Sequence, residues 1–177
     1  MLDVTARLAA EGGYDAVQMR AVAVEADVAL GTLYRYFPSK EHLLVSAMLR
    51  QIESLSDRLL VRPAAGTDAV GRVVDVLRRA NSALQRQQQF TVAVVRALAA
   101  GDETVAPVVR EVRDLMAGIV LAAIGTDDPT EREQLVTEIL QEVWLSSLVA
   151  WISGVQPSTS VGRKLEAAAT LLLEGQP

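Results

Sequence analysis

The sequence has no cysteine and only one histidine among its 177 residues. Disulfide bonds and thiolate metal sites are therefore excluded, and a single imidazole cannot hold a metal ion by itself. Aromatic residues make up only 4% of the chain, whereas half of its residues are apolar. Alanine, leucine and valine dominate the apolar half, which favours a helical protein packed by aliphatic side chains.

Two kinds of apolar segment are also missing. The first residues, MLDVTARLAAEGG, lack the basic start and the apolar run of a signal peptide. No run of about 18 uncharged apolar residues occurs, so we expect neither a membrane span nor a membrane partner. These absences predict a cytoplasmic protein.

The formal net charge of −5 is unfavourable for binding to DNA phosphates. Residues 1–62 hold seven basic and eight acidic residues, and residues 63–177 hold ten basic and fourteen acidic ones. The N-terminal part is thus less acidic than the remainder, but it is not basic. Composition alone predicts few phosphate contacts for each subunit.

Helical periodicity is most informative between residues 18 and 44. A first short helix there has its apolar residues at helical spacing. A second short helix is predicted over residues 30–37, with Leu33 and Phe37 four residues apart on its inner face. Pro38 ends this helix, because proline has no N–H to donate and disfavours the helical conformation of the residue before it.

Two such short helices cannot form a core alone, and the second one turns hydroxyls and an arginine outward. That arrangement is the plan of a helix-turn-helix, whose second helix enters the major groove of DNA. The letters GTLYRYFPSKEHLL, preceded by AVAVEADVAL, resemble the DNA-binding signature of the TetR family of transcriptional regulators. The motif covers about the first third of the chain.

This resemblance implies an all-α fold of about nine helices. A three-helix helix-turn-helix domain would occupy residues 1–45, with a fourth helix as a connector to about residue 61. Residues 62–177 would form a helical ligand-binding and dimerisation domain. The sequence fits this division, because residues 62–67 contain proline and glycine and further helical stripes of apolar residues follow.

The second short helix and its flanks carry the predicted DNA contacts. Arg35 is the only long hydrogen-bond donor on that helix, so we expect it to read a guanine edge, with a phosphate contact as the alternative. The resemblance implies phosphate contacts for Tyr34 and Tyr36, which could otherwise serve as packing aromatics, and Lys40 is a further phosphate anchor. The predicted set is Gln18, Arg20, Ala29, Leu30, Gly31, Thr32, Tyr34, Arg35, Tyr36 and Lys40.

Apolar residues of the later helices supply two further predicted sites. Trp144 and Trp151 lie seven residues apart on one helix face, which suits core or dimer packing, with the wall of a ligand pocket as the alternative. The predicted pocket comprises Leu59, Leu77, Phe90, Val94, Leu98, Val112, Met116, Ile119, Trp144, Leu148 and Trp151. The predicted dimer interface, which the resemblance places in the last two helices, comprises Leu135, Ile139, Val143, Leu145, Leu165, Ala168 and Leu172.

The function that follows is a homodimeric transcriptional regulator that represses its genes. Two recognition helices would bind a near-palindromic double-stranded DNA operator with half-sites roughly 34–36 Å apart, or a multiple of that spacing. A small, largely apolar effector would release the DNA. The segments GGYDAVQMRAVA and EVWLSSLVAWIS resemble regulators of steroid catabolism in this family, which implies a steroid- or lipid-derived acyl-CoA as effector. No cofactor and no metal are predicted.

Two other functions remain open at this stage. An enzyme is disfavoured, because the residues offer no set of nucleophile and base. A dimeric lipid-binding or adaptor protein with weakened DNA binding is the stronger alternative. It is favoured by the acidic balance and by Val17 and Gln18, where the family usually has a threonine or serine.

Overall fold

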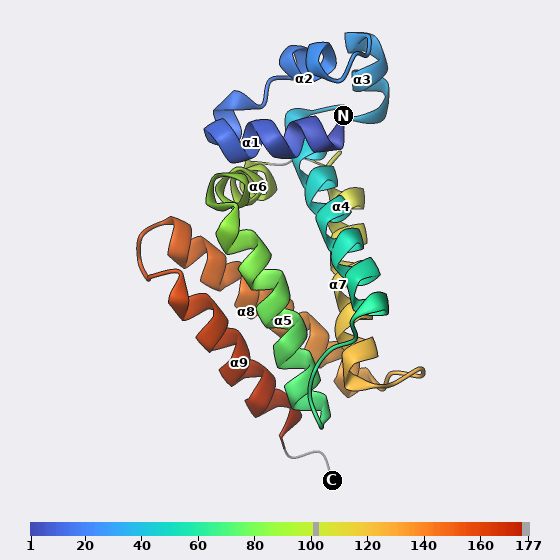
Figure 1. The fold of residues 1–177 in the computed structure, drawn as a ribbon, viewed down its shortest axis with the longest axis vertical. Helices are drawn as coiled ribbons and strands as arrows, with labels where there is room; N and C mark the ends of the chain where they lie inside the picture. The colour runs from blue at the N-terminus through green and yellow to red at the C-terminus, as the bar shows by residue number, and fades with distance from the viewer. Residues whose placement is uncertain (101–102, 175–177) are drawn as a thin grey trace. The chain divides into compact units, whose positions relative to one another are not determined.

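The computed structural model describes residues 1–100 and 103–174, which form nine α-helices and no strand (Figure 1). The all-α class predicted from composition and periodicity is confirmed. The helices are α1 (Leu2–Ala16), α2 (Met19–Glu25), α3 (Leu30–Tyr36), α4 (Lys40–Val61), α5 (Ala69–Arg86), α6 (Gln88–Ala100), α7 (Ala106–Ile124), α8 (Glu131–Ile152) and α9 (Thr159–Leu173).

Local side-chain chemistry fixes the start of two helices. The Ser39 hydroxyl accepts a hydrogen bond of 3.1 Å from the His42 N–H in the first turn of α4. At the start of α8, the Thr130 hydroxyl accepts from the Glu133 N–H at 3.2 Å, and the Glu133 carboxylate accepts from the Thr130 N–H at 2.8 Å. This reciprocal capping box satisfies two N–H groups that the helix itself cannot pair.

The helices divide into two compact units, each built from two stretches of chain. Unit 1 comprises Met1–Ser54 and Leu84–Val112, and unit 2 comprises Leu55–Ala83 and the residues from Arg113 onward. This geometric division differs from the predicted one, because residues 84–112 pack with the N-terminal helices. The functional division into residues 1–45 and 62–177 stays a prediction.

Unit 1 has an apolar core that fixes its short helices. Leu33 of α3, Leu44 of α4 and Phe90 of α6 are fully buried there. Burying one such side chain contributes roughly 1.5–3 kcal/mol. α1 packs along α6, and its helical conformation is interrupted at Gly13, where φ is 69°. α2 and α3 are therefore held by packing rather than by their own short length.

In unit 2, α8 packs against α9 and is apolar on more than one side. Among the described residues it is the one helix long and apolar enough to cross a membrane, although core helices of soluble proteins pass the same test. Only 33% of its apolar window is buried within the structure. Its outer side leaves three large apolar side chains exposed: Leu135, Leu145 and Val149.

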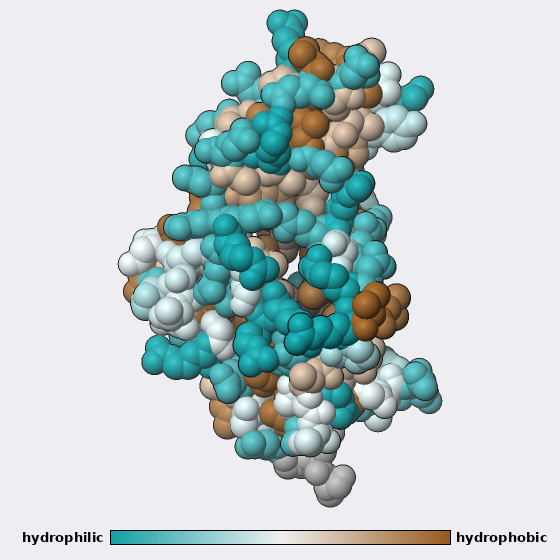
Figure 2. All heavy atoms as spheres, viewed as in Figure 1, coloured by the Kyte–Doolittle hydropathy of each residue, from teal (hydrophilic) through white to brown (hydrophobic). Residues whose placement is uncertain are grey.

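The hydrophobic patches on the face of the molecule drawn in Figure 2 are small and are separated by hydrophilic side chains. Isolated apolar side chains of this kind are normal on a protein surface. On α9, Leu171 is 78% exposed. Exposed large apolar side chains on two packed helices are candidates for contact with a second subunit.

Candidate nucleic-acid interface and ligand cavity

A tight turn joins α2 to α3. Asp27 has a φ of 52°, in the left-handed region that few residues other than glycine adopt. Its N–H donates to the Val24 carbonyl at 3.2 Å, and the Val28 N–H donates to the Ala23 carbonyl at 3.0 Å. These two bonds form the Schellman motif that ends a helix and redirects the chain. The turn thereby sets the angle at which α3 leaves α2.

The side chains of α3 separate into an inner and an outer face. Leu33 points into the core of unit 1, and Phe37, just past the helix, packs against that core. Tyr34, Arg35 and Tyr36 are exposed. The Arg35 guanidinium lies 5.1 Å from the centroid of the Tyr36 ring, and its Nη2 is 3.5 Å from the Tyr36 hydroxyl. The outer face therefore offers hydrogen-bond donors to a partner, as the sequence indicated.

The other predicted DNA-contacting residues border this face. Exposed positions are Gln18, Arg20, Ala29 and Gly31, and partly buried positions are Leu30, Thr32 and Lys40. Gln18 precedes α2 without capping it through its side chain. The structure holds no DNA, so contact by any of these residues stays a prediction.

Lys40 already has a partner within unit 1. Its Nζ donates to the Tyr14 carbonyl at 3.3 Å and lies 3.7 Å from the centroid of the Tyr14 ring. The Arg96 guanidinium lies 4.5 Å from that centroid. A hydrogen bond to Glu41 raises the pKa of Tyr14 to about 12, with burial adding to the shift, so the phenol stays protonated. A phosphate contact by Lys40 would have to be shared with this cluster.

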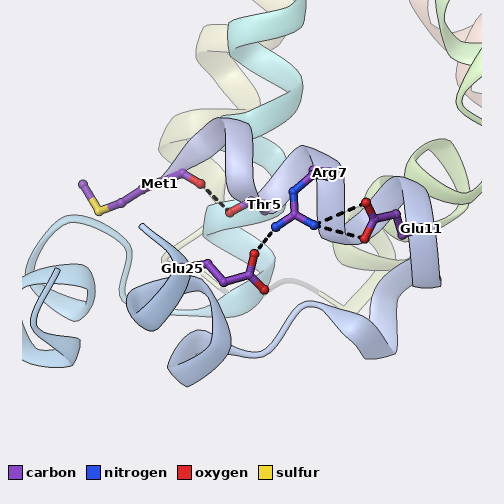
Figure 3. Close-up of polar contacts among 5 residues, drawn as sticks. All are labelled: Met1, Thr5, Arg7, Glu11 and Glu25. Carbon is purple, nitrogen blue, oxygen red and sulfur yellow. Dashed lines mark hydrogen bonds and ion pairs between the residues drawn. The ribbon is translucent and has the colours of Figure 1, made fainter. Parts of the chain in front are cut away.

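Arg7 links α1 to the end of α2 (Figure 3). Its guanidinium pairs with Glu11, one turn further along α1, at 3.1 Å and also with Glu25 of α2. Pairs this exposed contribute only about 0–1 kcal/mol. The position of α2 therefore depends mainly on the buried core, and the ion pairs of Arg7 add only a small stabilisation.

Unit 2 contains a cavity of about 400 Å³ beside the end of α4, the start of α5 and the second half of α7. Small-molecule sites typically measure roughly 300–1,000 Å³ and are lined mainly by apolar side chains. Here, too, apolar side chains predominate. The lining residues are Ser56, Leu59, Leu60, Pro63, Ala64, Arg72, Val76, Asp114, Leu115, Gly118, Ile119, Ala122 and Ala123.

The predicted pocket residues do not form one site. Leu59 and Ile119 line the cavity. Others belong to unit 2 without lining it: Leu77, Met116, Trp144, Leu148 and Trp151. The remaining ones belong to the core of unit 1 or pack against it, and we therefore remove them from the pocket: Phe90, Val94, Leu98 and Val112. Helical spacing marked these side chains as inward but could not tell which interior they enter.

Arg72 is a cavity residue that the sequence did not reveal. Its Nε donates to the Ala123 carbonyl at 2.8 Å, and its Nη2 donates to the Ile124 carbonyl at 2.9 Å. These carbonyls end α7 and lack partners within the helix. Gly125 follows with a φ of 96°, and a Cβ there would lie 3.3 Å from Nη2 of Arg72. The guanidinium is thus fixed at the cavity wall by the end of α7.

Asp75 fixes the loop that contributes Pro63 and Ala64 to the cavity. Its carboxylate accepts a hydrogen bond of 2.9 Å from the Ala65 N–H and pairs with Arg79 at 2.6 Å. Burial acts to raise the pKa of Asp75, but the Ala65 hydrogen bond and the neighbouring arginines lower it overall. Arg79 also donates to the carbonyl of Pro63 at 3.1 Å. Two side chains of α5, Asp75 and Arg79, therefore bind the backbone of this loop.

The predicted dimer residues lie on α8 and α9. Leu135 and Leu145 are exposed, and four more are partly buried: Ile139, Val143, Ala168 and Leu172. Leu165 is only 1% exposed, so it belongs to the interior of unit 2 rather than to an outer face. The structure contains one chain, so the interface itself stays a prediction.

Two family models match the chain. The model described as bacterial regulatory proteins, tetR family, matches residues 1–47, and the model of tetracyclin repressor-like C-terminal domains matches residues 66–172. The chain belongs to the TetR family of bacterial transcriptional regulators. It is 44% identical over 173 residues to the HTH-type transcriptional repressor KstR of Rhodococcus jostii RHA1, covering 98% of this chain and 81% of that protein.

Solved structures show the same fold. A TetR transcriptional regulator from Rhodococcus sp. RHA1 superposes with a TM-score of 0.90 and 30% identity, covering 99% of this chain and 94% of that one. Thermus thermophilus FadR, a TetR-family repressor in complex with lauroyl-CoA, gives a TM-score of 0.70 over 100% of this chain and 95% of that one. Its 21% identity shows the fold alone.

Proposed function

We propose that this protein is a transcriptional repressor that binds DNA through α3 and is released from it by a small apolar effector in the cavity of unit 2. The observation that carries the DNA-binding part is the outer face of α3. Tyr34, Arg35 and Tyr36 project from a helix whose Leu33 is fixed in a closed core. The 44% identity to a transcriptional repressor supports the same role.

The DNA complex that we propose contains two copies of the chain. The exposed apolar side chains on α8 and α9 of each copy would form the contact between the two copies. Two copies of α3 would then enter successive major grooves of a near-palindromic operator, with half-sites roughly 34–36 Å apart or a multiple of that distance. Such a repressor works in the cytoplasm, and we assign it no enzymatic activity.

The effector that we propose is a lipid- or steroid-derived acyl-CoA. Support comes from the apolar lining of the cavity and from the lauroyl-CoA complex of FadR, which shares the fold. α4 runs from Lys40 to Val61, so residues of this one helix belong to both units. An effector can release DNA only by as much as its affinity differs between the two states of the protein. A hundredfold loss of operator affinity requires a difference of about 2.7 kcal/mol.

Gly118 gives independent support to the cavity as a binding site. It lies inside α7, where a glycine costs roughly 0.5–1 kcal/mol relative to alanine. A Cβ at this position would meet no atom within 4 Å, so packing does not require a glycine. We propose that the missing side chain leaves room for the effector beside α7.

The proposal is tested by finding the operator and then removing the contacts. Sheared genomic DNA is captured with the protein at physiological salt, and the retained fragments are sequenced. Once the shared palindrome is known, the double variant Tyr34→Phe/Arg35→Ala is compared with Arg86→Ala, a change at an exposed arginine on α5. We expect operator affinity to fall by about 30-fold or more for the double variant alone, because two lost contacts at roughly 1–3 kcal/mol each remove at least about 2 kcal/mol.

Two other outcomes would change the proposal. Unchanged operator affinity in the double variant would show that the contact assignment on α3 is wrong. Failure to enrich any DNA fragment, together with retained lipid binding, would favour a dimeric lipid-binding or adaptor protein. Two observations favour that alternative: Lys40 already donates a hydrogen bond to the Tyr14 carbonyl, and the chain is acidic overall.

A further inference from the structure

We infer that the effector carries an oxygen acceptor that binds Arg72, while its apolar body lies along α7 at Gly118. This inference rests on the proposed function and specifies the chemistry of the effector. It follows from an arginine at the wall of an otherwise largely apolar cavity and from the open space above a helical glycine. The acceptor that we propose is a carbonyl oxygen, which can accept a hydrogen bond from a guanidinium.

The guanidinium of Arg72 has donors to spare. Its Nε and Nη2 are engaged by the carbonyls of Ala123 and Ile124. Among residues 1–100 and 103–174, no acceptor is found for its Nη1. An arginine is always charged and carries five N–H donors, so its free donors remain available to a ligand. A purely hydrocarbon ligand would cover these donors without pairing them, which is unfavourable.

The carboxylate that lines the same cavity does not neutralise Arg72. Asp114 contributes to the lining, but no ion pair of 4 Å or less joins it to Arg72 within the described part of the chain. The partners of Arg72 are two backbone carbonyls, which offset its charge only in part. An additional acceptor supplied by the ligand therefore strengthens binding, and bonds that involve a charged donor are roughly twice as strong as neutral ones.

The cavity wall is already arranged for such a ligand. The end of α7 holds the guanidinium, and the clasp of Asp75 and Arg79 holds the loop with Pro63 and Ala64. A site whose groups are fixed before binding loses less conformational entropy when the ligand arrives. Discrimination between ligands with and without the oxygen should therefore be sharp, because Arg72 cannot turn away to water without giving up both carbonyls.

The test uses two pairs of ligands that differ only in the oxygen. Lauroyl-CoA is compared with S-dodecyl-CoA, its thioether analogue, and androst-4-en-3-one is compared with androst-4-ene. Binding to the full-length protein is measured by calorimetry, and release of the operator is measured in parallel. In the wild-type protein we expect the oxygenated member of at least one pair to bind 10-fold or more tightly than its partner. The pair that shows this difference identifies a thioester or a ring ketone as the source of the acceptor.

The same ratio is then measured in two variants. Arg72→Met should reduce the ratio to about one, and Arg132→Met, a change at an exposed arginine of α8, should leave it unchanged. Arg72→Met also removes two hydrogen bonds at the end of α7, so its thermal unfolding is recorded alongside. A general loss of stability weakens both members of a pair equally and does not alter their ratio.

Three results would overturn the inference. Equal binding of both members of each pair to the wild-type protein would show that neither the thioester carbonyl nor the ring ketone is recognised, so the inference would fail while the proposed effector class would stand. A wild-type ratio that persists in Arg72→Met would assign the recognition to another residue. If no compound of either pair binds or releases the operator, the effector class of the proposed function fails, and the inference fails with it.

Discussion

Unit 1 and unit 2 use their interiors in different ways. In unit 1, large side chains such as Leu33 and Phe90 are fully buried, and the residues proposed to act lie on the outer face of α3. In unit 2, the core leaves a cavity of about 400 Å³. Two buried polar atoms there, Asn81 Oδ1 and Trp144 Nε1, also lack a hydrogen-bond partner within the described residues. The described part of unit 1 is thus closed around large side chains, whereas unit 2 contains open space and unpaired buried polar atoms.

The largest expected effect follows from shortening a core side chain of unit 1. Leu33→Ala should lower the free energy of unfolding by about 3 kcal/mol, within a range of roughly 2–5, because it leaves a void in a closed core. Operator binding should fall with it, since Leu33 fixes α3. Urea unfolding and operator affinity measure the two effects.

The matched control for this change lies at the cavity of unit 2. Leu60 lines the cavity and is 81% exposed, so Leu60→Ala should change stability by less than about 0.5 kcal/mol. Equal losses of stability in Leu33→Ala and Leu60→Ala would contradict the assignment of Leu33 to a closed core.

A smaller effect is expected at the clasp beside the cavity. Asp75→Asn keeps the shape of the side chain but removes its charge, which should cost about 2 kcal/mol because hydrogen bonds to charged groups contribute roughly 1.5–3 kcal/mol. The exposed Asp57 on α4 provides the control, as Asp57→Asn should have little effect.

The same clasp predicts how stability depends on pH. The pKa of Asp75 is lowered in the folded protein from its ordinary value of 3.8, so the charged form stabilises the fold. This contribution is fully present above the ordinary value and is lost as the pH falls through the lowered one. The stability gap between wild type and Asp75→Asn should thus be constant near neutral pH and shrink below about pH 4. A gap that widens on acidification would show that the assigned shift has the wrong sign.

The third effect separates stability from function in unit 2. Gly118→Ala should stabilise the protein by about 0.5–1 kcal/mol, because alanine suits a helix interior better than glycine. Gly118→Leu should occupy the cavity, raise the effector concentration needed for operator release by 10-fold or more, and leave operator affinity without effector unchanged. Titration of the operator complex with the effector measures both variants. An unaltered effector response in Gly118→Leu would place the effector site elsewhere.

The sequence predicted the inner and outer faces of α3 better than the lining of the cavity, and the reason is the range of the interactions. Leu33, Phe37 and Pro38 define α3 through spacing and backbone chemistry that act within a few residues. The role of Arg72 depends on carbonyls about 50 residues further along the chain, as its bond to Ala123 shows. Likewise, nothing local distinguishes the interior that Phe90 enters from the one that Ile119 enters. Periodicity tells which side of a helix is inward, whereas tertiary packing decides which neighbours it meets.

The smallest expected effect concerns the turn that ends α2. Asp27 adopts a positive φ that glycine adopts without steric cost, so Asp27→Gly should stabilise unit 1 by about 0.5 kcal/mol. Asp27→Val should destabilise unit 1 by about 1 kcal/mol or more, because a β-branched residue is strained at a positive φ. Thermal unfolding measures the order of the three proteins. Unlike the cost at Gly118, the cost at Asp27 serves no opening in the structure. Operator affinity and effector response should therefore both change less than about threefold in Asp27→Gly. Within that limit, operator affinity should rise slightly, because the variant lacks one negative charge near the DNA phosphates. If this variant were more stable but had lost its effector response, the turn that ends α2 would itself take part in effector-induced release of the operator. The distinction between the closed core of unit 1 and the cavity of unit 2 would then no longer hold.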